Sequence, residues 1–227
     1  MLHFHLVTLF PKSIESYLKS SIIGRAQKEK KIKVSFYDPK KFTRNKHRRV
    51  DRRPYGGGPG MVLEPDAVLR AATAALKSKR RRLLDFSVVF FATNGKQFDE
   101  EMAKKFSRKK DILLICGHYE GVDERVFKVL SAKGGSVFGG KAKKVSMGPY
   151  VLTGGELPAA VLIDAVSRFV PDVLGKAESL ERSRVSSPEV YTRPEVFAWK
   201  NKKYRVPKVL LTGHHAKIDE WKQKKLK

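Results

Sequence analysis

Two adjacent glycines, Gly154 and Gly155, interrupt an apolar strand pattern immediately before a strong helix pattern. A glycine has no Cβ, so the backbone at these positions can approach a ligand or another segment closely. Glu156 and Pro158 follow within the first turn of the expected helix, where an acidic residue and a proline are both favoured. Apolar residues then recur every three or four positions from 159 to 170, which predicts the helix itself. This strand-loop-helix segment is therefore a candidate ligand-binding loop.

Two further glycine-bearing segments compete for the same role. Residues 54–61 could cradle phosphates through backbone N–H groups, but they lack the Gly-Lys-Ser/Thr ending of a P-loop. No Gly-x-Gly-x-x-Gly pattern follows a strand, which disfavours a Rossmann site for dinucleotides. Residues 116–125 follow an apolar strand, and loops that leave the carboxyl ends of parallel strands are where α/β sheets bind ligands. From spacing alone, ligand binding and simple turn formation remain equally open.

Strand-like and helix-like patterns alternate along the chain, which predicts an α/β fold with a largely parallel sheet. Residues 176–190 are rich in Ser, Glu and Arg, as in a linker, and a small basic helical segment follows up to Trp221. The expected strands are 3–10, 32–37, 87–92 and 112–116, and the expected helices are 13–27, 64–77, 99–106, 123–130 and the one after Gly155.

The charge balance indicates a polyanionic partner. Lys and Arg number 48 against 23 Asp and Glu, a formal net charge of +25. Nucleic acid is favoured over a membrane, because the basic residues form separate clusters and no apolar run approaches the roughly 20 residues of a membrane span. The apolar start, residues 1–11, lacks a cationic region and a cleavage site, so it is expected to be a strand and not a signal peptide. The single cysteine, Cys116, excludes an internal disulfide and fits a reducing cytoplasm.

Four segments, taken in order, closely resemble bacterial tRNA (guanine-N1)-methyltransferases of the TrmD type. They are residues 50–61, 116–126, 150–158 and 191–194, and the match runs from residue 1 to Trp221. Four motifs in the right order are far more specific than any one of them. The resemblance implies the SPOUT methyltransferase architecture: a parallel α/β sheet with a deep trefoil knot, a small, mainly helical C-terminal domain, and a homodimer with its sites at the interface.

The resemblance also divides the chain and assigns an activity. Residues 1–175 are expected to form the knotted catalytic domain that binds S-adenosylmethionine, 176–190 the interdomain linker, and 191–227 the small tRNA-binding domain. The implied reaction transfers a methyl group from S-adenosylmethionine to guanine N1 of the nucleoside immediately 3′ of the tRNA anticodon (tRNA position 37). Two alternatives stay open: a SPOUT enzyme for another RNA nucleoside, and a non-catalytic RNA-binding protein.

By resemblance, the two later glycine-bearing loops form the S-adenosylmethionine site. A bent S-adenosylmethionine needs backbone donors and acceptors for its adenine and close approach that side chains would block. The alternative is that Tyr119 and Tyr150 are core aromatics and the glycines only form turns. Pro149 departs from the family, which usually has aspartate there. The residues carried over are Gly117, Tyr119, Glu120, Gly121, Ser146, Met147, Gly148, Pro149, Tyr150, Val151, Leu152, Gly154 and Gly155.

The chemistry needs a base, because guanine N1 carries a proton near neutral pH, and a cation to stabilise the charge that grows on O6. In the family these are a linker aspartate and an arginine on the helix after the double glycine. By position they correspond to Glu178 and Arg168, with Glu181 as a substitute for Glu178. The resemblance also implies that Mg²⁺ can assist, but it supplies no ligand set beyond carboxylates such as Glu120, so no metal site is predicted. The RNA-binding residues carried over are Asp51, Tyr55, Gly57, Gly58 and Arg193.

Other residues have less specific interpretations. His3 and His5 share one face of the first strand and are expected to be packed or partly exposed, and Cys116 to be a buried, inert thiol. The pair His214 and His215 is expected to form a structural turn, because adjacent side chains point to different faces and no cysteines lie nearby. Aromatic residues interleave with the last two basic clusters, either as stacking groups for bases or as the core of the small domain; these are Trp199, Tyr204 and Trp221.

Overall fold

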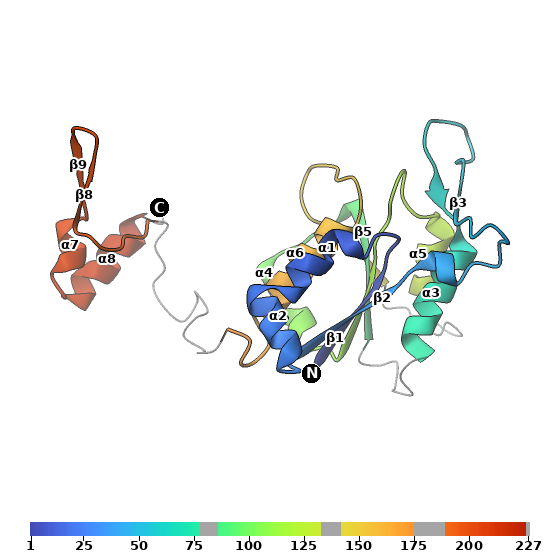
Figure 1. Cartoon of the computed structure of the whole chain (residues 1–227), viewed down its shortest axis with the longest axis horizontal. Coiled ribbons are helices and arrows are strands. Elements are labelled where there is room, and N and C mark those ends of the chain that lie inside the picture. The colour runs from blue at the N-terminus through green and yellow to red at the C-terminus, as the bar shows by residue number, and fades with distance from the viewer. Residues whose placement is uncertain (78–85, 133–141, 175–188, 226–227) are drawn as a thin grey trace. The chain divides into compact units, whose positions relative to one another are not determined.

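The computed structural model describes residues 1–77, 86–132, 142–174 and 189–225 (Figure 1). The chain divides into two compact units, Met1–Val173 and Leu174–Lys227. Within the described part, no helix is both long and apolar enough to span a membrane.

The first unit is built on a five-stranded sheet whose neighbouring strands are all parallel, in the order β2-β1-β6-β5-β7. This confirms the predicted α/β fold with a parallel sheet. Two of the three interior strands, β1 and β6, are buried along their whole length, as expected for strands covered on both faces. The strands are β1 (Leu2–Val7), β2 (Ile32–Tyr37), β5 (Phe86–Gln97), β6 (Asp111–Ile115) and β7 (Ala142–Ser146).

Helices cover both faces of the sheet and form two separate apolar cores (Figure 1). On one face lie α1 (Lys12–Lys19), α2 (Ser21–Lys28), α4 (Glu100–Ser107) and α6 (Glu156–Ser167), and on the other α3 (Pro65–Lys77) and α5 (Glu124–Ser131). Alternate residues of β1 serve the two cores, because successive side chains of a strand point to opposite faces: Phe4 contributes to the first core and Val7 to the second. The result is a three-layer α/β/α unit.

The helix predicted over residues 13–27 is in fact two helices, α1 and α2. Ser20 is extended (φ −102°, ψ 163°) and Ser21 has φ 47°, so the chain changes direction between them. The Gly24 N–H donates to Ser20 O at 2.8 Å, and a Cβ on Gly24 would lie 2.1 Å from Lys19 O. Both helices pack their apolar residues into the same core, so helical spacing continues across residues 13–27. The apolar spacing therefore did not indicate the break.

Two predicted strands also have different bounds, since β1 ends at Val7 and β5 continues to Gln97. The pairing of β5 with β7 shifts register between Phe91 and Lys96, so β5 bends in its second half. Gly95 makes the bend possible, because a Cβ there would lie 2.5 Å from Val145 N. The strand before the double-glycine loop, β7, is a lysine-bearing edge strand instead of the apolar strand that was expected.

A short antiparallel ribbon, β3 (Asp51–Arg52) with β4 (Val62–Leu63), carries the glycine-rich residues 53–61, here called the glycine loop. It follows the 3₁₀ turn η1 (Pro39–Lys41). Gly56, Gly57, Gly58 and Gly60 all have positive φ, which lets the loop turn repeatedly without side-chain strain.

The second unit contains a β-hairpin that was not among the expected elements. Strands β8 (Val196–Trp199) and β9 (Lys202–Arg205) are joined by a two-residue turn in which Lys200 has φ 52°. The aromatic residues Phe197 and Tyr204 are cross-strand partners, and such residues favour strands. The helices α7 (Lys208–Leu211) and α8 (His215–Lys225) follow. The expected basic helical segment is thus present but begins only after the hairpin.

Candidate functional site

A cavity of about 500 Å³ lies at the carboxyl ends of β6 and β7 and beside the middle of β5, where β5 bends. This is the edge of a parallel sheet where α/β proteins bind ligands. Four segments line most of the cavity: residues 90–94, 117–122, 144–147 and 150–155. The two later glycine-bearing loops of the sequence therefore face one common space.

The cavity brings together nearly all of the residues carried over for the cofactor. Gly148 and Pro149 are the exceptions, since they belong to the same loop but do not line the cavity. Those that line it are Gly117, Tyr119, Glu120, Gly121, Ser146, Met147, Tyr150, Val151, Leu152, Gly154 and Gly155.

The two loops are held together by backbone contacts that only glycine permits. The Gly155 N–H donates to Gly117 O at 2.7 Å, and Gly154 forms an antiparallel bridge with His118. A Cβ on Gly155 would lie 2.5 Å from Cys116 Cα and 2.9 Å from Gly117 N. The close approach expected at the double glycine is thus an approach to the end of β6. The glycines build the cavity by joining its two walls.

Beneath these contacts lies a buried polar group at the start of α6. Glu156 is 6% exposed, and Thr8 Oγ1 donates a hydrogen bond to Glu156 Oε1 at 2.6 Å. Cys116 is buried beside it, and burial raises the pKa of the Cys116 thiol well above its usual range, with the negative Glu156 adding to the shift. Cys116 is therefore the inert, buried thiol that the sequence indicated, at the base of the site.

The tyrosines of the two loops are half exposed, which excludes the alternative that they are core aromatics. Tyr119 is 50% exposed and Tyr150 55% exposed. Tyr119 also has φ 59°, an uncommon conformation for a residue with a Cβ, and its OH-bearing ring lies edge-on to His118 at 4.7 Å. Tyr150 donates from its OH to Met147 O at 3.0 Å, across its own loop.

The glycine loop packs against the cavity wall through backbone hydrogen bonds. The Glu120 N–H donates to Met61 O at 3.0 Å, and Leu63 N–H donates to Gly121 O at 3.0 Å. Glu120 lies over Gly60, since a Cβ on Gly60 would lie 2.5 Å from Glu120 Oε1, and the positive φ of Gly60 (84°) favours glycine there. Glu120 does not pair with the nearby Arg125. Arg125 instead pairs with Asp123, with Arg125 Nη2 2.7 Å from Asp123 Oδ2.

Part of the cavity wall was not predicted. Residues 90–94 line it because β5 bends there, and His118 lines it between the expected Gly117 and Tyr119. Lys144 and Glu124 also face it as an ion pair, with Nζ 2.8 Å from Oε1. Gly95, which lies just beyond the expected strand 87–92, is the one sequence signal for the bend, since a glycine within a strand often marks a bulge or a close backbone approach.

Of the expected catalytic residues, only Arg168 belongs to the described part of the chain, and it does not line this cavity. Arg168 is the residue that ends α6, where its N–H donates to Asp164 O at 3.2 Å, and it is not part of the cavity lining. Glu178 and its substitute Glu181 lie outside the described residues.

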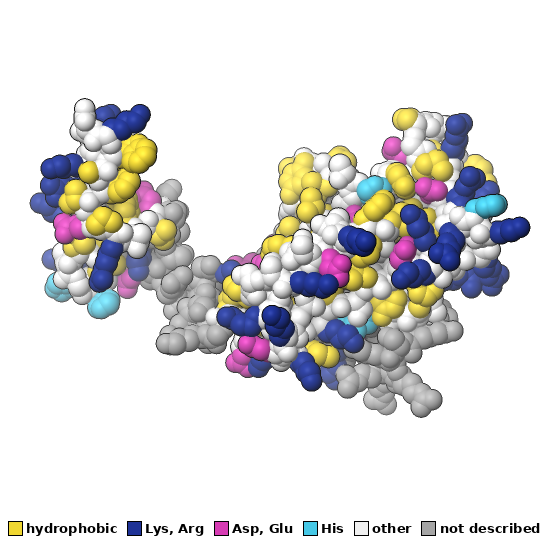
Figure 2. All heavy atoms as spheres, in the orientation of Figure 1, with side chains coloured by type: hydrophobic (Ala, Val, Ile, Leu, Met, Phe, Trp, Pro, Cys, Tyr) yellow, Lys and Arg dark blue, Asp and Glu magenta, His cyan; other side chains and the backbone are white. Residues whose placement is uncertain are grey.

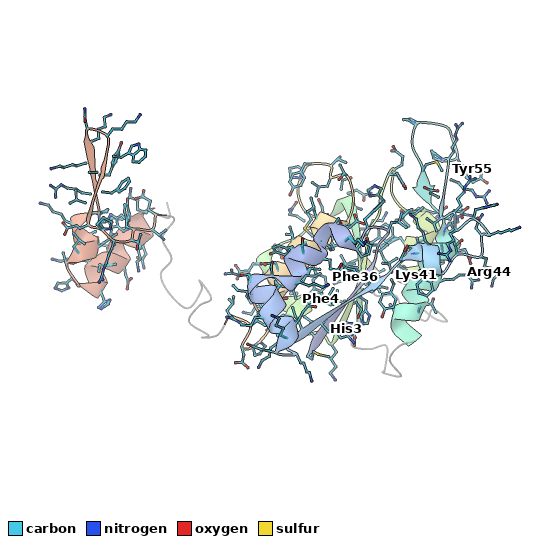
Figure 3. The ribbon with its side chains drawn as sticks, viewed as in Figure 1. His3, Phe4, Phe36, Lys41, Arg44 and Tyr55 are labelled. Atoms are coloured by element: carbon cyan, nitrogen blue, oxygen red, sulfur yellow. The ribbon has the colours of Figure 1, made fainter. Side chains whose placement is uncertain are left out.

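The expected RNA-binding residues fall in both units. Tyr55, at the tip of the glycine loop, is fully exposed, and Asp51 begins the ribbon that carries it (Figure 3). Arg193 is exposed in the second unit. Exposed cations surround the glycine loop, and Figure 2 shows Lys and Arg gathered over this part of the first unit. They are Lys40, Lys41, Arg44, Lys46, Arg48, Arg49, Arg52 and Arg53.

In the second unit, the hairpin presents its aromatic residues to solvent. Trp199 is 61% exposed and Tyr204 54% exposed, so they are not the core of this unit as described. Trp221 differs, because it is half-buried and its ring lies 6.4 Å from that of Tyr191. Trp199 and Tyr204 of the hairpin are therefore free to act as stacking groups, whereas Trp221 of α8 packs within the second unit.

Comparison with known proteins gives one consistent family. The sequence profile described as tRNA (Guanine-1)-methyltransferase TrmD matches residues 2–227. A tRNA (guanine-N(1)-)-methyltransferase of Clostridioides difficile is 39% identical over 226 residues, covering 98% of this chain and 91% of the relative. The protein of the same name from Caldanaerobacter subterraneus is 42% identical over 227 residues, covering 98% and 86%.

The burial of Cys116 makes a prediction about its reactivity. Because only the thiolate reacts with an alkylating reagent, the native protein should be alkylated at least about 10-fold more slowly than the denatured protein at about pH 8.5. Raising the pH further should bring the denatured rate to a plateau while the native rate keeps rising, since the folded pKa is raised. Mass spectrometry of the single thiol measures both rates. Equal rates would show that Cys116 is accessible and ionises normally.

Proposed function

The chain belongs to the tRNA (guanine-1)-methyltransferase TrmD family, and on this basis we propose that it transfers a methyl group from S-adenosylmethionine to guanine N1 of the tRNA nucleoside immediately 3′ of the anticodon. The observation that carries the proposal is the cavity at the carboxyl ends of β6 and β7, beside the bend in β5. Its walls are the two loops through which the chain resembles the family. A tRNA substrate and a buried, reduced Cys116 are consistent with a cytoplasmic enzyme.

The cavity suits S-adenosylmethionine in size and in chemistry. Its volume of about 500 Å³ lies within the usual range for small-molecule sites. Backbone groups of residues 117–121 and 150–155 can serve the adenine and ribose, while Val151 and Leu152 supply apolar surface. When bound there, S-adenosylmethionine would supply the electrophilic methyl group.

A knotted course of the chain is part of the proposal. It is supported by the intimate contact between the loop after β7 and the loop after β6, from Gly154 and Gly155 to Cys116, Gly117 and His118. A knot of this kind requires segments that are distant in the sequence to pass each other at such backbone distances.

A homodimer is also proposed, and exposed apolar side chains support it. On α6, Leu157 is 57% exposed and Val161 52% exposed, and Val151 in the preceding loop is 83% exposed. Figure 2 shows hydrophobic side chains gathered at this loop. A contiguous apolar surface of this kind is typical of an interface. Since Arg168 does not line its own cavity, we place it at the partner's cavity in the dimer.

In the proposed reaction, Glu178 accepts the N1 proton of guanine as N1 attacks the methyl group, and Arg168 stabilises the charge on O6. Glutamate replaces the family's aspartate with the same charge and one more methylene. For the Mg²⁺ that the family implies, Glu120 is the candidate ligand, since it lines the cavity and Mg²⁺ is often held by one or two carboxylates with water and substrate oxygens.

The decisive experiment is methyl transfer from labelled S-adenosylmethionine to a tRNA transcript, followed by nucleoside analysis. The expected product is N1-methylguanosine, absent when the guanosine 3′ of the anticodon is replaced by adenosine. A different methylated nucleoside would indicate a related enzyme for another RNA site. Binding of both substrates without transfer would indicate a non-catalytic RNA-binding protein.

Gly155→Val should abolish S-adenosylmethionine binding in a folded protein, because the new side chain meets the backbone at Cys116 and forces the cavity walls apart. Calorimetry gives the affinity and circular dichroism checks the fold. Gly154→Ala is the graded control. Its Cβ would meet side-chain atoms of Glu156 and His118, which can move, so the loss should be smaller. Unchanged affinity in Gly155→Val would contradict this placement of the cofactor.

Affinity for tRNA should fall steeply as salt rises, with a log-log slope of about −0.7 to −0.9 per phosphate contacted. Affinity for S-adenosylmethionine over the same salt range is the internal control and should change far less. Arg48→Ala, in the exposed cluster near the glycine loop, should make the slope shallower by about 0.9 while leaving cofactor affinity unchanged. A flat salt response for tRNA would mean that the charge of +25 serves another purpose.

Glu178→Gln should keep both substrates bound but lower the single-turnover rate by about 10² to 10⁴-fold, because the base is lost. Glu178→Asp restores the family residue and should remain active. Glu181→Gln, three residues later, is the matched control and should be nearly silent. If Glu181→Gln is the inactive variant and Glu178→Gln turns over normally, the catalytic carboxylate is Glu181.

A further inference from the structure

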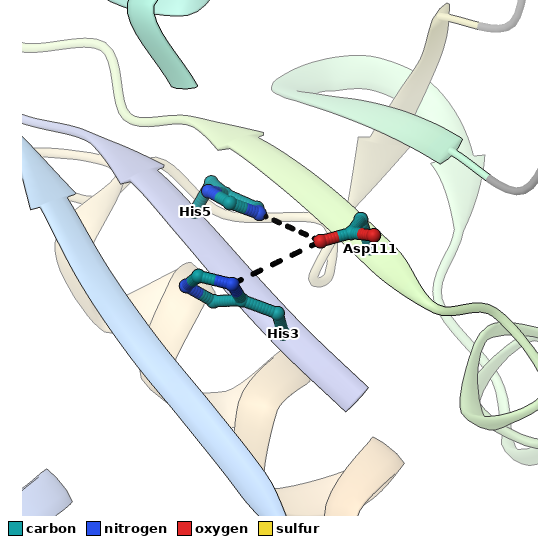
Figure 4. A group of neighbouring side chains, drawn as sticks. All are labelled: His3, His5 and Asp111. Carbon is teal, nitrogen blue, oxygen red and sulfur yellow. Dashed lines mark hydrogen bonds and ion pairs between the residues drawn. The ribbon is translucent and has the colours of Figure 1, made fainter. Parts of the chain in front are cut away.

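A second cluster of chemically capable side chains lies at the opposite edge of the sheet from the cavity. His3 and His5 are in β1, and Asp111 is the first residue of β6, where it is the register partner of His3 (Figure 4). All three are buried, with 3%, 0% and 4% exposure. Their side chains point to the face of the sheet that α3 and α5 cover. On that face, later residues of the same two strands, such as Val7 and Leu113, form the second apolar core.

The ligand-type atoms of the cluster converge on one point. His5 Nε2 lies 3.0 Å from Asp111 Oδ1 and His3 Nδ1 lies 3.8 Å from the same oxygen. The two imidazole rings are 3.8 Å apart at 30°, so their inner nitrogens are aimed the same way (Figure 4). One atom from each residue lies within 4.8 Å of the others. In a tetrahedral zinc site with bonds of about 2.0 Å, the ligand atoms are about 3.3 Å apart. The two distances from the histidine nitrogens to Asp111 Oδ1, 3.0 Å and 3.8 Å, lie on either side of that value.

The outer nitrogen of each ring already has a hydroxyl partner on the neighbouring strand β2. His3 Nε2 is 2.8 Å from Ser35 Oγ, and His5 Nδ1 is 3.2 Å from Tyr37 OH. A hydroxyl can accept an N–H, and such a bond fixes the tautomer that leaves the inner nitrogen unprotonated. Histidines that bind metals nearly always have this second hydrogen bond, which orients the ring.

We propose that His3 Nδ1, His5 Nε2 and Asp111 Oδ1 bind a divalent transition-metal ion, with Zn²⁺ as the expected occupant. Two imidazole nitrogens and one carboxylate oxygen suit Zn²⁺, whereas Mg²⁺ prefers oxygen ligands and retains its water. Water or another side chain completes the tetrahedron. The ion joins β1 to β6, and through Ser35 and Tyr37 it also orders β2. Its role is structural, because the cofactor cavity lies at the other ends of these strands.

The direct test is titration of the full chain with ZnCl₂ after dialysis against a chelator, followed by calorimetry and thermal unfolding. One Zn²⁺ per chain should bind and raise the Tm, while MgCl₂ should do neither at this cluster. His3→Gln should lower zinc affinity more than about 100-fold, and Ser35→Ala about 10-fold or more. The double variant His214→Ala, His215→Ala is the matched control and should bind Zn²⁺ as the wild type does, since among the described residues this pair belongs to no cluster of three ligands.

A readout on the unaltered protein keeps the proposal testable if His3→Gln does not fold. Co²⁺ in place of Zn²⁺ should give the intense visible absorption of a tetrahedral site, and added Zn²⁺ should displace it. Only the weak spectrum of hydrated, octahedral Co²⁺ would overturn the proposal. So would zinc binding that is lost in the His214 and His215 double variant and retained in Ser35→Ala and His3→Gln. In either case the two histidines and Asp111 share protons and hold no metal.

Discussion

The hydrogen bond from Gly155 N–H to Gly117 O is the contact on which the candidate site depends. It joins the loop after β7 to the loop after β6 at a distance that no Cβ could tolerate, since one on Gly155 would lie 2.5 Å from Cys116 Cα. Because α6 begins at Glu156, the same contact also sets where that helix starts. The side chain of Glu156 is then buried against Thr8 at the end of β1. The cavity therefore exists because the backbones of these two loops are in direct contact.

A chain of backbone hydrogen bonds extends this arrangement outwards. The loop after β6 donates from Glu120 N–H to Met61 O of the glycine loop, and its Gly121 O accepts from Leu63 N–H in the adjoining strand β4. The surface that bears Tyr55 and the exposed arginines is therefore attached directly to one wall of the cavity. A polyanion bound at the glycine loop would lie next to a small molecule bound in the cavity. Such adjacency is what transfer between a cofactor and a nucleic acid needs.

The two edges of the parallel sheet serve different purposes. At the carboxyl ends of the strands, loops diverge and leave space, so this edge holds the cavity. At the amino ends, β1 and β6 start side by side, and three polar residues fill positions that apolar side chains occupy further along the same rows. Burial of a carboxylate is costly unless it is paired or bound to a cation. His3 and His5 meet that requirement for Asp111, either by hydrogen bonding to its carboxylate or by binding the proposed metal ion together with it.

The sequence by itself determined the α/β class, the buried strands β1 and β6, and the two loops that line the cavity. These are local properties, because periodicity, apolar runs and glycine-bearing motifs are written in neighbouring residues. Only the tertiary structure decided which segments meet: that Gly155 approaches Cys116, that β5 bends to bring residues 90–94 to the cavity, and that Asp111 reaches His3 and His5. Contacts between residues this far apart depend on strand order and register, which no local pattern encodes. The break at Ser20 and the hairpin at residues 196–205 were missed for a related reason. Amphipathic spacing does not show where one helix ends and the next begins. The hairpin has only a two-residue turn, and its many basic residues obscure the strand pattern.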